Sequence, residues 1–307
     1  MMAEINTEPC GVLIINKPEG PTSHDIVNKI RRLYSTKKVG HTGTLDPMAT
    51  GVLVILIGRA AKACEYSLSD RKKYTATLRL GIETDTEDTT GNVLKEYDVN
   101  VSESEVQAVL GRFKGRIMQI PPMYSALKVG GKKLCDIARE GGTVEREARP
   151  VDIYSISAQH IEGNDYRLVV ECSAGTYIRT LCADIGKALG CGGAMASLER
   201  SAACGFSIED SHTIEELESL SSEERLALLR PVEEIFYELD AVKLPSFYER
   251  LFRSGCEIYL KKAKLPEHPA GTRLRVLDSK GVFFALGEVK DYENGLAVKS
   301  IKLFSLT

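Results

Sequence analysis

The order of strand-like and helix-like patterns constrains the fold of this 307-residue chain more than any other feature. Four runs have the continuous or alternating apolar pattern of β-strands: residues 12–15, 52–57, 74–80 and 167–172. Apolar residues at helical spacing follow the N-capping residues Thr22 and Ser102, which predicts helices over residues 23–34 and 103–113. Because helices and strands do not alternate strictly, we expect an α+β fold and not a doubly wound parallel sheet.

The texture of the sequence changes after Pro245. Short β-type segments separated by glycine-containing turns, among them Asn294-Gly295, predict a small β module over residues 245–307 beside a larger domain of residues 1–240. Within the larger domain, residues 122–150 carry two Gly-Gly pairs and lie between prolines. This composition predicts a mobile insertion.

Composition excludes several classes of protein. The longest aliphatic run has six residues, whereas a helix across a bilayer needs about 20, so no membrane span is expected. The N-terminal stretch lacks the basic and apolar regions of a secretory signal, which predicts a cytoplasmic protein. Eight cysteines without a C-x-x-C pair argue against a structural zinc site. The net charge of −3 gives no bulk support for nucleic-acid binding, but local basic clusters at residues 28–43 and 71–73 can still attract phosphate.

The segment with the clearest chemical potential is Gly40–Gly51, GHTGTLDPMATG. Glycines allow tight turns, and Pro47 restricts the preceding Asp46 to extended geometry, so one carboxylate is presented from a rigid loop. Such a carboxylate can serve as a nucleophile, although most Asp-Pro pairs in glycine-rich loops are ordinary turns.

This loop resembles the Asp-bearing motif of the TruB family of pseudouridine synthases, which isomerise uridine 55 in the T-loop of tRNA. Further blocks similar to those of the family follow the family's order: NKPEGPTSHD at 16–25, KKY at 72–74, TDTEDTTG at 84–91, FKGRIMQIPPMYSALKVGG at 113–131 and CSAGTYIRTLCADIG at 172–186. The resemblance implies a pseudouridine-synthase fold with a central mixed, largely antiparallel sheet. It also implies a thumb-like insertion at residues 122–150, called the thumb segment below, and a small C-terminal β-rich PUA-like domain that binds RNA.

The resemblance also implies roles for individual residues. Asp46 would act as nucleophile or base while the glycosidic bond breaks, uracil rotates and a C–C bond forms. Arg179 would pair with it, since a buried carboxylate without a cation nearby tends toward its neutral form. Tyr74 would stack on the flipped base and is a candidate for the later proton step at C5. The substrate-binding residues implied are His41, Tyr74, Tyr177, Leu198, Lys17, Lys128, Lys132 and Lys133.

The implied substrate is the T-arm of tRNA, bound by a monomer without metal or cofactor. The sequence does not say whether an acylal, a Michael adduct or a glycal forms. Many family members carry two arginines after the pocket leucine, whereas this chain reads Leu198-Glu199-Arg200, which puts phosphate contacts at that place in doubt. 

Two other functions stay open on the sequence. A tRNA-folding chaperone could retain the same residues without catalysis. A glycoside hydrolase using Asp46 covalently would need a second carboxylic acid, and the loop around Asp46 provides none.

Overall fold

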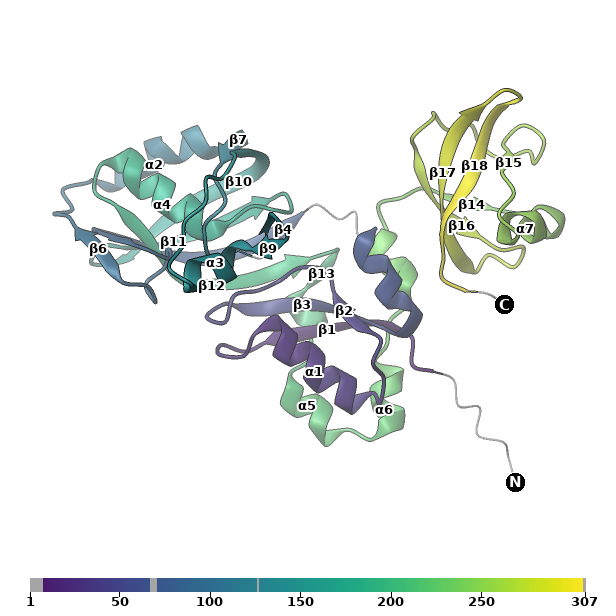
Figure 1. Ribbon diagram of the computed structural model, residues 1–307, viewed down its shortest axis with the longest axis horizontal. Coiled ribbons are helices and arrows are strands. Elements are labelled where there is room, and N and C mark those ends of the chain that lie inside the picture. The colour runs from purple at the N-terminus through teal and green to yellow at the C-terminus, as the bar shows by residue number, and fades with distance from the viewer. Residues whose placement is uncertain (1–7, 67–70, 126, 306–307) are drawn as a thin grey trace.

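The computed structural model describes residues 8–66, 71–125 and 127–305, and within them two large sheets dominate the fold (Figure 1). The larger sheet has the strand order β1-β3-β12-β4-β11-β10-β7, with β2 paired to β3 and β13 to β12. Its strands are β1 (Gly11–Lys17), β2 (Val39–His41), β3 (Thr50–Ile57), β4 (Lys72–Leu80), β7 (Gly115–Gln119), β10 (Arg149–Glu162), β11 (Asp165–Cys172), β12 (Gly193–Ala203) and β13 (Phe206–Ser207). All pairings are antiparallel except that between β3 and β12. The predicted α+β fold with a mixed, largely antiparallel sheet is therefore confirmed.

Strands β1 and β3 are apolar without interruption because both of their faces are buried. Leu13 and Ile55 belong to a cluster shared with the helices, whereas Ile14 and Val54 belong to a second cluster on the opposite face. The predicted strands at residues 12–15 and 52–57 thus pair with each other in register, and β1, although buried on both faces, is the last strand at one end of the sheet. The Asp46 loop leads directly into β3.

Helices complete the larger body, and the predicted capping boxes are present. Thr22 caps α1 with Asp25, and Ser102 caps α2 with Glu105. The helices of this body are α1 (Ser23–Leu33), α2 (Glu103–Leu110), α4 (Ile178–Leu189), α5 (Ile214–Ser219) and α6 (Ser222–Ala227), with 3-10 turns η1 (Gly58–Glu65), η2 (Gly111–Phe113), η3 (Ile208–Asp210) and η4 (Val232–Phe236). Helix α2 ends earlier than the predicted residue 113 because its last turn tightens to η2.

The thumb segment runs between β7 and β10 and contains a small hairpin and one short helix. The hairpin pairs β8 (Lys128–Val129) with β9 (Lys132–Lys133), and α3 (Leu134–Arg139) follows it. Ala126 of this segment lies outside the described residues. A separate hairpin of β5 (Ile82–Thr84) and β6 (Val93–Glu96) brackets the loop 85–92.

The second sheet forms its own lobe at the C-terminal end (Figure 1). Its strand order is β14-β16-β17-β18-β15, formed by β14 (Ala241–Lys243), β15 (Ile258–Tyr259), β16 (Arg273–Leu277), β17 (Phe283–Tyr292) and β18 (Gly295–Leu303), and α7 (Ser246–Arg253) packs on it. Phe283 and Phe304 of this lobe stack around Phe236, with ring centroids 5.9 and 5.7 Å from its ring. This aromatic group belongs to the same buried cluster as Ile14 and Val54, so the lobe is packed against the back of β1 and β3. Among the described residues, no helix combines the length and apolar character needed to cross a bilayer.

Candidate active site

The loop that presents Asp46 joins β2 to β3 and is anchored by its neighbours. The buried Ser23 hydroxyl donates to the Leu45 carbonyl at 3.0 Å, and the Leu45 amide donates back to that hydroxyl at 2.8 Å. Leu45 itself is buried in the core. The residue before Asp46 is thereby held on both its polar and its apolar side, which fixes where the Asp46 side chain starts.

Lys17, which the resemblance places among the substrate-binding residues, is 0% exposed in the structure. Its ammonium group donates to the carbonyls of Pro18, Pro47 and Ala49 at 2.8, 3.2 and 2.6 Å. Burial lowers the pKa of Lys17 to about 8, although the nearby Asp46 carboxylate opposes this shift. Lys17 acts on the loop that carries Asp46 and not on a bound molecule.

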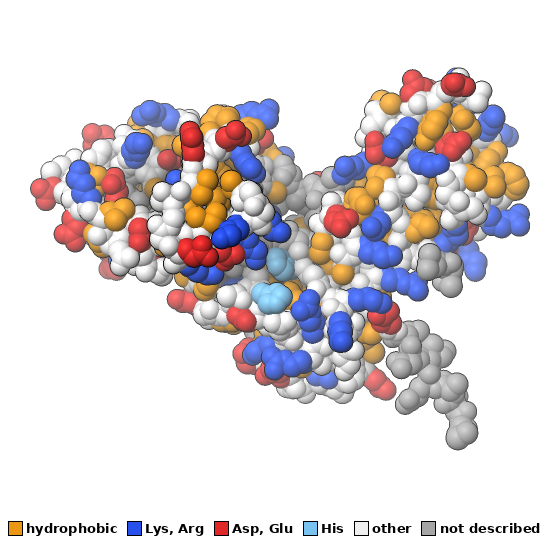
Figure 2. All heavy atoms as spheres, in the orientation of Figure 1, with side chains coloured by type: hydrophobic (Ala, Val, Ile, Leu, Met, Phe, Trp, Pro, Cys, Tyr) orange, Lys and Arg blue, Asp and Glu red, His pale blue; other side chains and the backbone are white. Residues whose placement is uncertain are grey.

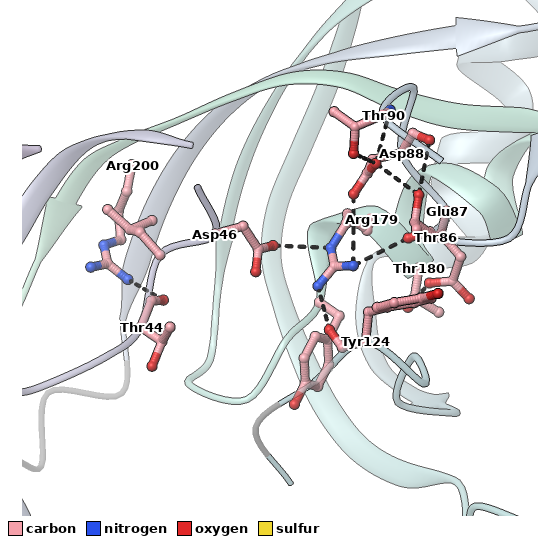
Figure 3. A network of polar contacts seen from close by, with 12 residues as sticks. Thr44, Asp46, Thr86, Glu87, Asp88, Thr90, Tyr124, Arg179, Thr180 and Arg200 are labelled. Atoms are coloured by element: carbon pink, nitrogen blue, oxygen red, sulfur yellow. Dashed lines mark hydrogen bonds and ion pairs between the residues drawn. The ribbon is translucent and has the colours of Figure 1, made fainter. Parts of the chain in front are cut away.

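Arg179 joins the Asp46 loop to two other segments (Figure 3). It is the second residue of α4, and its Nε lies 3.0 Å from Asp46 Oδ2. Its Nη1 donates to the Thr86 carbonyl at 3.2 Å, and its Nη2 donates to the Tyr124 carbonyl in the thumb segment at 2.8 Å. The expected pairing of Asp46 with Arg179 is present, and one buried guanidinium reaches three separate segments.

Asp88 is a second carboxylate at this site, which the sequence reasoning did not identify. Its Oδ2 lies 3.7 Å from Arg179 Nη1, on the other side of the guanidinium from Asp46 (Figure 3). Its Oδ1 accepts hydrogen bonds from the Thr86 hydroxyl at 2.8 Å and from the Thr90 hydroxyl and amide at 2.6 and 3.0 Å. All of these groups donate to the Asp88 side chain. Asp88 therefore serves as a hydrogen-bond acceptor here, whereas a glycoside hydrolase would need a carboxylic acid that donates a proton. The TDTEDTTG block, with its acids and hydroxyls, carries the signal for this role.

The charge state of Asp46 results from opposing effects. Burial raises the pKa of Asp46 above that of an ordinary aspartate, and the Asp88 carboxylate adds to this, whereas Arg179 and Lys17 oppose it. The Asp46 carboxyl group is thus partly withdrawn from water while the Arg179 guanidinium remains beside it.

Tyr74 and Leu198 line the sheet next to this loop. They lie on the adjacent strands β4 and β12, and both side chains are buried in the cluster that also contains Leu45. Burial raises the pKa of Tyr74, so its phenol is neutral at physiological pH. These two residues form an apolar wall beside the Asp46 loop.

His41 closes β2 just before the Asp46 loop and is partly buried. Burial and the Arg200 charge lower the pKa of His41, so its ring is neutral at pH 7. Its Nδ1 is buried and has no hydrogen-bond partner among the residues that the structure describes. On the face shown in Figure 2, Lys and Arg side chains lie around the visible histidines at the centre of the molecule.

Tyr177 is the residue before α4 and contacts the end of β7. The buried Gln119 amide accepts from the Tyr177 amide at 2.8 Å and donates to the Tyr177 carbonyl at 3.0 Å. Gln119, another residue that the sequence reasoning missed, therefore fixes the start of the helix that bears Arg179. A pocket lined by Tyr177, Pro121 and Leu127 lies beside this contact, with a volume of about 200 Å³.

The remaining predicted residues are exposed. Lys128, Lys132 and Lys133 lie on the β8–β9 hairpin of the thumb segment, away from the Asp46–Arg179 pair, and Lys132 Nζ is 3.7 Å from Glu140 Oε2. Glu199 is exposed on β12, between the buried Leu198 and Arg200. Because successive side chains of a strand point to opposite faces, Glu199, the residue that departs from the family pattern, lies on the face opposite Leu198. In the described ranges, no group of three or more His, Cys, Asp or Glu side chains is placed to hold a metal ion.

Comparisons with known proteins agree with one another. A family model described as "TruB family pseudouridylate synthase (N terminal domain)" matches residues 31–178, and one described as "tRNA pseudouridylate synthase B C-terminal domain" matches residues 179–237. The tRNA pseudouridine synthase B of Alkaliphilus oremlandii is 47% identical over 249 residues, covering 81% of this chain and 83% of that protein. The one from Clostridium kluyveri is 42% identical over 294 residues, covering 96% and 99%.

Two solved structures have the same fold as this chain over most of its length. A chain from the crystal structure of a Cbf5-Nop10-Gar1 complex superposes with a TM-score of 0.74 at 27% identity, covering 96% of this chain and 85% of that chain. A chain from an H/ACA RNP bound to a substrate RNA containing 2'-deoxyuridine superposes with a TM-score of 0.72 at 25% identity, covering 96% and 85%. The likeness extends over both sheets.

Proposed function

The chain belongs to the TruB family of pseudouridylate synthases and isomerises uridine to pseudouridine in tRNA, and we propose that it acts on uridine 55 of the T-loop through Asp46. The expected pseudouridine-synthase fold is confirmed by the structural likeness. The observation that supports a catalytic Asp46 is its 3.0 Å contact with a buried arginine, made by a side chain that is itself 36% exposed and so can reach a bound substrate. A chaperone without catalysis would not need a carboxylate held this way.

The reaction is an isomerisation, so its atoms and electrons balance without a redox partner. The C1′–N1 bond breaks, the uracil ring turns, and C5 forms a bond with C1′. The proton on C5 leaves, and N1 gains one. The Asp46 carboxylate supplies the electron pair or accepts the proton that starts this sequence, and any of the three intermediates is compatible with its position.

Arg179 keeps the Asp46 carboxylate ionised and fixes its orientation. Its guanidinium offsets the desolvation that raises the pKa of Asp46, and its planar donors fix the orientation of the carboxylate. The apolar wall of Tyr74 and Leu198 is suited to an everted uracil ring, because stacking on an aromatic side chain contributes about 1–3 kcal/mol per base. The Tyr74 hydroxyl would take part in the later removal of the C5 proton. Because its phenol is neutral, it would pass its own proton on as it accepts that one, and N1 gains a proton in the overall reaction.

Substrate binding involves more distant surfaces. The thumb segment carries exposed lysines and begins next to Arg179 through the Tyr124 carbonyl, so closing it over the T-arm would also tighten the site. We assign residues 1–240 to the catalytic domain and residues 245–307 to a PUA-like RNA-binding domain. The protein would act as a monomer in the cytoplasm, where tRNA is modified.

The test is incubation of an unmodified tRNA transcript with the purified protein, followed by carbodiimide mapping of pseudouridine. The expected result is a stop at the T-loop uridine. Asp46→Asn should abolish the stop while tRNA affinity changes less than about threefold, because the amide keeps the shape of the side chain but lacks its charge.

The matched control is Asp98→Asn, which alters an exposed aspartate and should leave the stop unchanged. A stop at another uridine would overturn the assignment to position 55, and pseudouridine formed by Asp46→Asn would overturn the role of Asp46. Release of free uracil would indicate hydrolysis instead.

A further inference from the structure

Arg200 is a buried arginine that none of the steps above uses. It is 1% exposed, among the most buried of the large side chains in the described residues. The sequence already puts phosphate contacts at this place in doubt, and a side chain enclosed in the core cannot reach the phosphate of a bound RNA. Burying a guanidinium is costly unless its donors are satisfied. The contacts it makes therefore indicate what it is there to hold.

Those contacts lie at both ends of the loop that carries Asp46. Arg200 Nη2 donates to the Gly43 carbonyl at 3.0 Å, and Nη1 lies 3.4 Å from the Thr44 carbonyl (Figure 3). Arg200 Nε donates to the Val52 carbonyl in β3 at 2.7 Å. The planar guanidinium of Arg200 thus joins the chain before Asp46 to the chain after it. Only the residues between Thr44 and Val52 remain outside these hydrogen bonds, so the loop that can move is short.

The backbone of Arg200 is fixed at the same place. It pairs with Gly51 of β3 in parallel register and with Tyr74 of β4 in antiparallel register. Gly51 has φ +97°, and a Cβ there would lie 2.3 Å from the Arg200 carbonyl oxygen, so only glycine permits this approach. Arg200 therefore lies where three strands of the site meet.

The side chain of Arg200 also reaches the pocket wall. Tyr74 is its cross-strand partner, so both side chains are on one face of the sheet, and the Arg200 charge opposes the rise in the pKa of Tyr74. In the described part of the chain, no carboxylate lies within ion-pair distance of Arg200, so its positive charge stays directed at carbonyl oxygens and the tyrosine. Asp46 and Tyr74 are thereby placed by the same group.

We propose that Arg200 is a positioning residue for pseudouridine formation, holding the Asp46 loop and Tyr74 in one fixed relation without touching the RNA. This inference rests on the proposed function of the site. Lysine cannot replace Arg200, because a single ammonium group cannot span Gly43, Thr44 and Val52 with the geometry of a planar fork.

The test is the single-turnover rate of tRNA modification with enzyme in excess, for wild type, Arg200→Lys and Arg200→Met. The rate constant at saturating enzyme should fall roughly 10- to 100-fold in both variants, because small misplacements of a reacting group cost this much. The reaction should still go to completion, and the tRNA dissociation constant should stay within about threefold. Arg200→Met buries no charge, so it serves if Arg200→Lys does not fold.

The matched control is Arg167→Lys, which makes the same chemical change at an exposed site on β11 and should leave rate and affinity unchanged. A loss of amplitude at an unchanged rate constant would mean that Arg200 only supports folding, and would overturn the proposal. So would weaker tRNA binding at an unchanged rate, which would mark a phosphate ligand. If wild type itself makes no pseudouridine, the proposed function fails and this inference falls with it, whereas an active wild type with unaffected Arg200 variants overturns this inference alone.

Discussion

Gln119 and Tyr177 are joined by two hydrogen bonds, in which the side-chain amide of Gln119 pairs with the backbone of Tyr177 as one strand pairs with another. The contact ties the end of β7 to the start of α4. No side chain caps α4, so this amide is what fixes its first turn. Arg179 lies in that turn, and the thumb segment begins just beyond Gln119.

Gln119→Leu should therefore lower both stability and rate. It leaves the backbone amide of Tyr177 without its partner, whereas the Tyr177 carbonyl still accepts from the Leu181 amide. An unpaired amide costs about 1–3 kcal/mol of unfolding free energy. We expect the single-turnover rate to fall roughly tenfold as Arg179 loses its fixed position. Thermal unfolding and rate measurements check this. The control is Gln107→Leu on α2, which removes one exposed hydrogen bond and should change stability and rate only slightly. An unchanged rate in Gln119→Leu would show that α4 keeps its position without this amide.

Arg179→Lys should be far more harmful than its conservative chemistry suggests. A lysine cannot reach Asp46 and the carbonyls of Thr86 and Tyr124 together. We expect the rate constant to fall about 100- to 1000-fold, as when one preorganised donor is removed from an active site. The measurement is single-turnover modification of tRNA. A rate within about twofold of wild type would show that charge alone is needed at this position.

The pH dependence of the rate should report the environment of Asp46. Since the pKa of Asp46 is raised and the reaction needs its ionised form, activity is lost as pH falls through that raised pKa. The acidic limb should therefore lie above the pKa of an ordinary aspartate. Removing the guanidinium in Arg179→Met should move the limb further up, because the cation opposes the shift. A limb that stays in place would assign it to another group.

The thumb lysines should contribute affinity and not rate. Replacing Lys128 or Lys133 by Gln removes one exposed positive charge from the β8–β9 hairpin. Each change should weaken tRNA binding and reduce the slope of log affinity against log salt by about 1, with saturated rates unchanged. Filter binding over a salt series measures this. The control is Lys95→Gln on β6, which should leave the salt slope of wild type unchanged. If the Lys128 and Lys133 variants also keep the slope of wild type, the RNA does not bind at the β8–β9 hairpin.

Local patterns were sufficient to predict helices α1 and α2 and the apolar strands of the larger sheet, but not α4, the helix that bears Arg179. The capping boxes at Thr22 and Ser102 and the apolar runs of β1 and β3 depend on neighbours in sequence, which a sequence displays directly. The pairing of Asp46 with Arg179 came from resemblance, because no spacing rule links positions so far apart.

The burial of long cationic side chains is what the sequence does not reveal. Such side chains are mostly exposed in proteins, yet Lys17 and Arg200 are both enclosed and bonded to carbonyls of the Asp46 loop. Asp88 and Gln119 act through contacts between distant segments that only the folded chain creates.

The aromatic group of Phe236, Phe283 and Phe304 has a consequence for how the protein can be divided. It covers the apolar rear of β1 and β3, the strands from which the catalytic loop extends. A truncation at residue 240 would remove two of its rings and bare that surface to water, inviting self-association. The larger domain and the C-terminal lobe thus share one apolar core, and separating them would expose it on both.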